Sequence, residues 1–84
     1  MPRYFFDTYD GDSFFPDEEG QELAGIEAAK LAAQAALPEM ARDKLPDGDQ
    51  GVFIVSVRNE AGQVALRIAL SLVVEYGSGS QALS

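Results

Sequence analysis

The hydrophobic pattern has period two at the start of the chain, a helical period in the middle and period two again at the end. In residues 2–9 the alternating side chains on one side are Tyr4, Phe6 and Thr8, and those on the other are Arg3, Phe5, Asp7 and Tyr9. Aromatic residues at this spacing are typical of a β-strand. Asp10-Gly11-Asp12 is a typical turn, and Ser13-Phe14-Phe15 can return as a short second strand before Pro16.

A helix is predicted from Gly25 or Ile26 to about Lys44, because this stretch is rich in Ala, Leu, Glu and Lys. Its apolar residues gather on one face, which is made of Ile26, Ala29, Ala33, Ala36, Leu37 and Met40. Since this face is mostly alanine, the helix should lie close to its sheet. Pro38 removes the hydrogen bond to the Gln34 carbonyl, so the helix either kinks or restarts there.

Two strands are predicted after the helix. The first runs from Val52 to Arg58, and a hairpin loop of residues 59–62 follows, with Gly62 where the left-handed conformation is expected. The last strand alternates from Val64 to Tyr76, with Val64, Leu66, Ile68, Leu70, Leu72, Val74 and Tyr76 toward the core and Val73 interrupting the opposite, polar side. At roughly 3.3 Å per residue it would extend over about 43 Å, twice the usual length. The excess either curls around the core or offers an edge to a second copy.

This order of elements predicts an α+β fold, a two-layer sandwich in which one helix covers an antiparallel sheet of three to four strands. Eighty-four residues make a single domain. We assign residues 1–76 to that domain and 77–84 to a flexible, Gly- and Ser-rich tail. Neither a signal peptide nor an apolar stretch of membrane-spanning length is present, so we expect a cytoplasmic protein.

The charge of the chain is strongly acidic and unevenly distributed. Residues 1–49 hold twelve acidic and four basic residues, whereas residues 50–84 hold two of each, so the whole excess of −8 lies in the first part. Clustered Lys and Arg are needed to bind phosphates, so nucleic acid and anionic membranes are not expected as partners. The acidic charge itself can serve solubility, attract a basic protein, or hold a cation.

Most catalytic chemistry is excluded by the residues that the chain lacks. It has no histidine and no cysteine, so Ser/His/Asp or Cys/His triads and zinc sites with nitrogen or sulfur ligands are impossible. No Gly-rich phosphate-binding loop can be read either. We therefore expect no enzyme and no cofactor.

The one constellation that suggests a ligand is a set of acidic residues on predicted turns. A calcium or magnesium site would use Asp7, Asp10, Asp12 and Asp17, since these ions prefer clustered oxygen ligands. The match to an EF-hand loop fails, because Asp12 stands where the glycine belongs. The alternative is that Asp10-Gly11-Asp12, like Asp47-Gly48-Asp49, is a plain turn.

The first hairpin carries more aromatic area than one buried face needs. We expect Phe5 and Tyr9 on the outer side of the sheet to mark an interface, together with Val73 and Tyr76 of the last strand, although these aromatics can also be simple surface residues. The favoured hypothesis is a non-enzymatic protein-interaction or regulatory module whose partner is a second copy, in a homodimer, or another protein. The alternative is a protein that binds a divalent cation.

The chain also resembles a family of small alphaproteobacterial proteins that is classed as a domain of unknown function. The resemblance rests on the opening Met-Pro-Arg-Tyr-Phe-Phe-Asp of residues 1–7, on Asp10-Gly11 and on residues 17–20, 27–29 and 57–62. It implies a bacterial, cytoplasmic, stand-alone domain and carries over no activity or cofactor. Gly25 and Pro38 depart from the family, whose members often have an aspartate cap near position 25 and no proline at 38.

Overall fold

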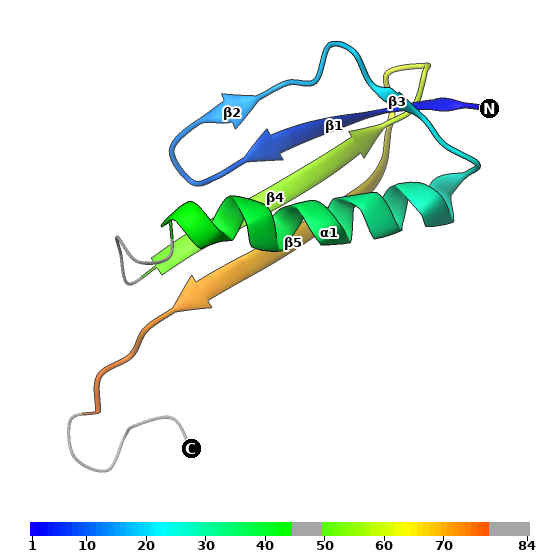
Figure 1. Cartoon of the computed structure of the whole chain (residues 1–84). Helices are drawn as coiled ribbons and strands as arrows, with labels where there is room; N and C mark the ends of the chain where they lie inside the picture. The colour runs from blue at the N-terminus through cyan, green and yellow to red at the C-terminus, as the bar shows by residue number, and fades with distance from the viewer. Residues whose placement is uncertain (45–49, 78–84) are drawn as a thin grey trace.

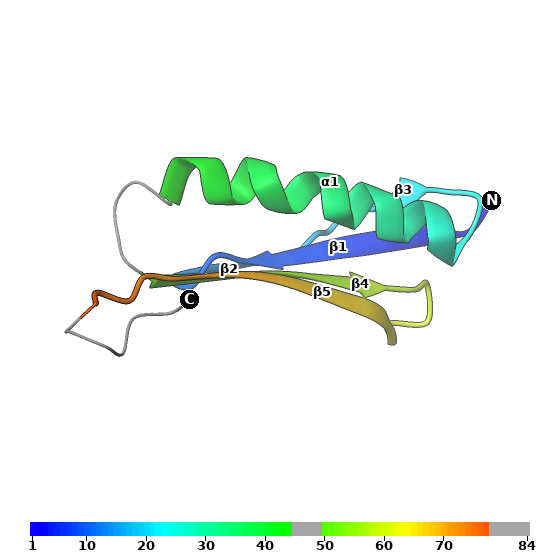
Figure 2. The same cartoon turned by 90° about the horizontal axis from the view of Figure 1, so that it is seen from below.

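The computed structural model describes residues 1–44 and 50–77, which form one helix and five strands. In chain order they are β1 (Arg3–Tyr9), β2 (Phe14–Phe15), β3 (Gln21–Glu22), α1 (Ile26–Lys44), β4 (Gln50–Arg58) and β5 (Val64–Val73). The strands pair antiparallel in the order β2-β1-β4-β5, and β3 also pairs with β1. Figures 1 and 2 show α1 along one face of this sheet. The predicted α+β sandwich is confirmed, with β3 as an added strand.

The core lies between α1 and the central strands. Its buried members are Tyr4, Ala29, Ala33, Leu37, Ala41, Phe53, Val55 and Val57. Large side chains of β4 face small alanines of α1, which allows the close approach that the sequence predicts. The predicted helix face needs two corrections. Ile26 is half exposed because it stands at the first turn of α1, and Ala41, one turn beyond Leu37, is buried in its place.

The helix continues through its proline. α1 runs without interruption from Ile26 to Lys44, so the alternative in which it restarts at Pro38 is wrong. Pro38 lies on an exposed side of α1, and Gln34, whose carbonyl loses its usual donor, is exposed as well. Water can therefore bind that carbonyl, which lowers the cost of the missing hydrogen bond. Within the described residues, no helix has the length and apolar character needed to cross a membrane.

The last strand is shorter than predicted and changes face near its start. β5 ends at Val73, which pairs with Gln50, the first residue of β4. Val74 and Tyr76, which were expected to face the core, lie beyond this end and are exposed. Leu66 pairs with Val57 while Val64 pairs with Arg58, so one extra residue forms a bulge. Since paired residues share a face, Val64 lies on the face opposite α1 and not in the core.

Close packing of α1 on the sheet predicts a clear difference between two alanines. Ala33→Leu should lower the free energy of unfolding by about 2 kcal/mol, because Ala33 is fully buried and the added atoms have no room. The control is Ala35→Leu, at an exposed position of the same helix, which should change stability by less than about 0.5 kcal/mol. Urea unfolding followed by circular dichroism measures both. Equal effects of the two substitutions would contradict the close packing.

Candidate functional site

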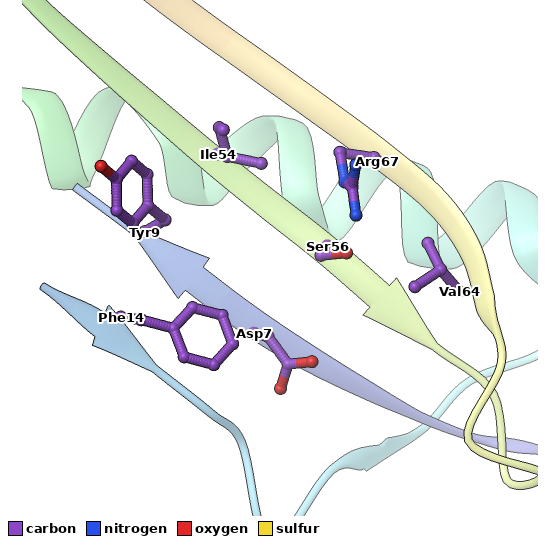
Figure 3. A pocket seen from close by; sticks show the side chains of 7 residues that line it. All are labelled: Asp7, Tyr9, Phe14, Ile54, Ser56, Val64 and Arg67. Atoms are coloured by element: carbon purple, nitrogen blue, oxygen red, sulfur yellow. The ribbon is translucent and has the colours of Figure 1, made fainter. Parts of the chain in front are cut away.

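The face of the sheet opposite α1 carries an open hollow of about 300 Å³. It is lined by Asp7, Tyr9, Phe14, Ile54, Ser56, Val64 and Arg67, which come from β1, β2, β4 and β5 (Figure 3). Tyr9 and Phe14 are paired neighbours on β1 and β2, and Ser56 pairs with both Asp7 and Arg67 across the sheet. Aromatic and aliphatic side chains make up most of the lining. The hollow therefore offers an apolar surface with one cationic side chain, Arg67, at its β5 side.

An ion pair between Asp7 and Arg58 joins β1 to β4 beside this hollow. Arg58 Nε lies 2.6 Å from Asp7 Oδ2, and Arg58 Nη2 lies 3.0 Å from Asp7 Oδ1. The guanidinium also lies 5.1 Å from the centre of the Phe5 ring, within range of a cation–π contact. The Asp7 side chain is buried, and the hydrogen bond from Arg58 holds its pKa below the ordinary value despite this burial. Asp7 is thus a structural carboxylate that neutralises Arg58.

Asp17 completes the outer edge of β1 at a place where no strand pairs with it. β3 pairs with β1 at Tyr4 and β2 pairs with it at Thr8, and between them the Phe6 N–H donates to Asp17 Oδ2 at 3.0 Å. The other Asp17 oxygen accepts the N–H groups of Glu19 and Gly20. Burial raises the pKa of Asp17, but the hydrogen bonds from these backbone donors lower it by more. The pKa of Asp17 therefore lies below its ordinary value. A side chain therefore performs the role of a missing strand residue.

Asp17 and Asp7 are also joined to each other and to the same arginine. The Asp17 N–H donates to Asp7 Oδ1 at 2.9 Å, and the Asp17 carbonyl accepts Arg58 Nη2 at 2.9 Å. Gly20 closes this loop with a φ of +73°, and a Cβ there would lie 2.9 Å from the Tyr4 carbonyl oxygen. A side chain at position 20 would therefore force the loop away from β1. This cluster was not predicted from the sequence, although an aspartate at the centre of an aromatic strand was a signal for it.

The four candidate cation ligands do not come together as one site. Asp7 and Asp17 belong to the cluster around Arg58, whereas Asp10 Oδ1 accepts the N–H groups of Asp12 and Ser13. Since Gly11 has a φ of +95°, residues 10–13 form the plain turn that was the alternative interpretation. In residues 1–44 and 50–77 no group of three or more acidic side chains could hold a metal. The cation site stays a prediction without structural support, and Asp47-Gly48-Asp49 lies outside the described residues.

The four candidate interface residues lie in two separate places. Phe5 and Tyr9 are both on the face opposite α1, as predicted, but Phe5 is partly buried under Arg58. Tyr9 forms a wall of the hollow, and its hydroxyl donates to the Gly11 carbonyl. Val73 and Tyr76, with 60% and 80% of their surfaces exposed, lie at and beyond the end of β5. These last two therefore belong to the edge of the sheet.

β5 is an outer strand of the sheet and has β4 as its partner on one side (Figure 1). Arg67 is its one charged residue, and it contains neither lysine nor proline. Its exposed apolar side chains lie on both faces, Val64 and Val73 opposite α1 and Leu70 on the α1 side. Natural proteins usually protect an edge strand with charges, proline or bulges. Apart from the bulge at its start, β5 carries little of this protection.

Removal of the buried carboxylate should weaken the fold. We expect Asp7→Asn to lower the free energy of unfolding by about 2 kcal/mol, because Arg58 loses its charged acceptor. The matched control is Glu39→Gln, whose partner Arg42 lies 3.9 Å away with both side chains exposed. That change should cost less than about 0.5 kcal/mol. Urea unfolding at neutral pH measures both, and equal losses would refute the structural role of Asp7.

The same carboxylates predict a loss of stability in acid. Asp7 and Asp17 have lower pKa values in the folded chain than in the unfolded chain, so their contribution is complete above the ordinary value of 3.8. It is lost as the pH falls through the folded pKa values. Urea unfolding from about pH 5 to about pH 2.5 should show a declining free energy of unfolding. Asp7→Asn should make this decline shallower, and an unchanged slope would contradict the assignment.

Comparison with known proteins places the chain in a family. The family model described as Domain of unknown function (DUF6894) matches residues 3–71. The match runs from the first residue of β1 into β5, and it includes Asp7, Asp17, Arg58 and all residues that line the hollow. No curated protein and no solved structure matches the chain. Because the matched residues make up most of its length, the chain belongs to the DUF6894 family, a family of domains of unknown function.

Proposed function

We propose that this chain is a small non-enzymatic protein-interaction module that works as a homodimer through β5. The observation that carries the proposal is the outer edge of β5, an exposed ladder of backbone groups with apolar side chains on both faces. An edge strand of this kind readily accepts another strand, since backbone hydrogen bonds supply affinity and the side chains supply specificity.

The charge distribution favours a second copy at this edge. Residues 1–49 carry the whole net charge of −8, whereas residues 50–84 are neutral overall. Two copies that meet through their acidic parts repel each other, while the β4–β5 hairpin lets them approach without that cost. The apolar residues Leu70 and Val73 would then be removed from water.

The chemistry of the described acidic residues supports a non-enzymatic role. The pKa values of Asp7 and Asp17 are shifted downward, because Arg58 and backbone N–H groups hold the two carboxylates. They remain charged at neutral pH, which makes them poor general acids. Cation binding draws no similar support, because the same bonds occupy the carboxylates that a metal would use.

The oligomeric state tests the proposal. Size-exclusion chromatography with light scattering should give twice the monomer mass, and Leu70→Lys should give a monomer with an unchanged circular dichroism spectrum. The control is Leu31→Lys, an exposed leucine on the outer side of α1, which should remain dimeric. A wild-type chain that stays monomeric at the highest soluble concentration would overturn the proposal.

A further inference from the structure

We infer that two copies pair their β5 strands antiparallel with Ser71 on the two-fold axis, so that Arg67 of each chain lies opposite Glu75 of the partner subunit. This inference rests on the homodimer proposed above and names its register. Residues 66–76 of each chain take part, which includes the short stretch after Val73 that has no strand partner among the described residues of a single copy.

Symmetry limits the possible registers. In an antiparallel pair of identical strands, residues at equal distances on either side of the axis lie opposite each other. Opposed residues of an antiparallel pair also share a face of the sheet. As a result, the helices of both copies lie on the same side of the continuous sheet. These two conditions are met only when the axis passes through a residue. The choice is therefore among the residues near the middle of the strand.

The charged residues select one of these axes. An axis at Arg67 would place two guanidinium groups opposite each other, which is unfavourable. Axes at residues 68, 69, 70 and 72 would place Arg67 opposite Ala69, Ser71, Val73 or Gly77, none of which is charged. The axis at Ser71 places Arg67 opposite the partner's Glu75, twice per dimer. Arg67 and Glu75 have no ion pair within the described part of a single chain, and both are exposed.

The same axis covers the apolar residues that a single chain leaves exposed on the α1 side. Leu70 would lie opposite Leu72 of the partner subunit, Ile68 opposite the partner's Val74, and Leu66 opposite the partner's Tyr76. In one copy Leu70 and Val74 are half exposed and Tyr76 is almost fully exposed. This pairing explains why apolar residues alternate as far as Tyr76 although β4 provides partners only as far as Val73.

Single cysteines can test the register, because the chain has no cysteine of its own. Ser71→Cys should form a disulfide-linked dimer under mild oxidation, since the two residues face each other on the axis. Ala69→Cys and Val73→Cys should not cross-link separately, because each lies about 13 Å from its own copy and a disulfide requires Cα atoms within about 7 Å. An equimolar mixture of these two variants should form the mixed disulfide.

Charge reversal gives a second, independent test. Arg67→Glu and Glu75→Arg should each raise the dimer dissociation constant by about tenfold, because two ion pairs become two repulsive pairs. The double variant should return to within about threefold of the wild-type constant. Arg42→Glu changes the net charge equally on α1, and it should leave the constant unchanged within about threefold. Sedimentation equilibrium measures the constants of the wild type and of the four variants.

The outcomes separate the register from the dimer itself. A monomeric wild-type chain would overturn the proposed function and the register together. A dimer in which Ala69→Cys cross-links alone while Ser71→Cys does not would overturn the register and leave the homodimer standing. A dimer in which no combination of these cysteines cross-links would also overturn the register, because the axis at Ser71 brings positions 69 and 73 together. Failure of the double charge variant to restore association would refute the Arg67–Glu75 pair.

Discussion

The carboxylates of Asp7 and Asp17 hold the segment between β1 and α1 against the sheet, and the rest of the fold depends on that attachment. This segment has only two strands of two residues each, β2 and β3, so backbone pairing alone holds it weakly. Asp17 bridges the gap between them on β1, and Arg58 joins both carboxylates to β4. This attachment fixes the position at which α1 begins. It also sets the orientation of α1, in which the alanines of the helix lie over β4.

One helix covers one face of the sheet, and no element of the described residues covers the other face (Figure 2). The side opposite α1 must therefore be stable in water or be covered by another molecule. Near β1 the chain covers part of this face with its own side chain, because Arg58 lies over Phe5 and pairs with Asp7. Toward β5 no comparable cover exists within the described residues, and apolar side chains remain exposed.

The periodicity of the sequence predicted the elements whose burial depends on local pattern. The face of α1 that contains Ala29, Ala33 and Leu37 follows from the helical repeat, and the outward position of Asp7 follows from strict alternation in β1. The limits of α1 were predicted equally well, because its composition changes sharply at Ile26 and again after Lys44.

The candidate site was less predictable because it depends on contacts between distant residues. Asp7 and Arg58 are 51 positions apart, and no local sequence pattern predicts with which carboxylate an arginine forms an ion pair. The bulge beside Arg58 shifts the register by one residue and moves Val64 to the other face, an effect that alternation cannot show. The metal interpretation of the acidic turn stays a prediction without structural support, because Asp10 Oδ1, an oxygen that would bind a cation, accepts the backbone N–H groups of Asp12 and Ser13.

The two edges of the sheet are unequal, and this inequality would limit the proposed assembly to two copies. β5 offers ten residues for pairing, whereas the opposite edge is β2, which has two residues and follows the acidic turn at Asp10 and Asp12. A strand added at β2 would have almost no backbone N–H and C=O groups to pair with, and it would lie next to negative charge. Once two β5 strands have paired, neither outer edge can extend the sheet further. The proposed pairing of β5 strands would thus close at two subunits and would not grow into a fibre.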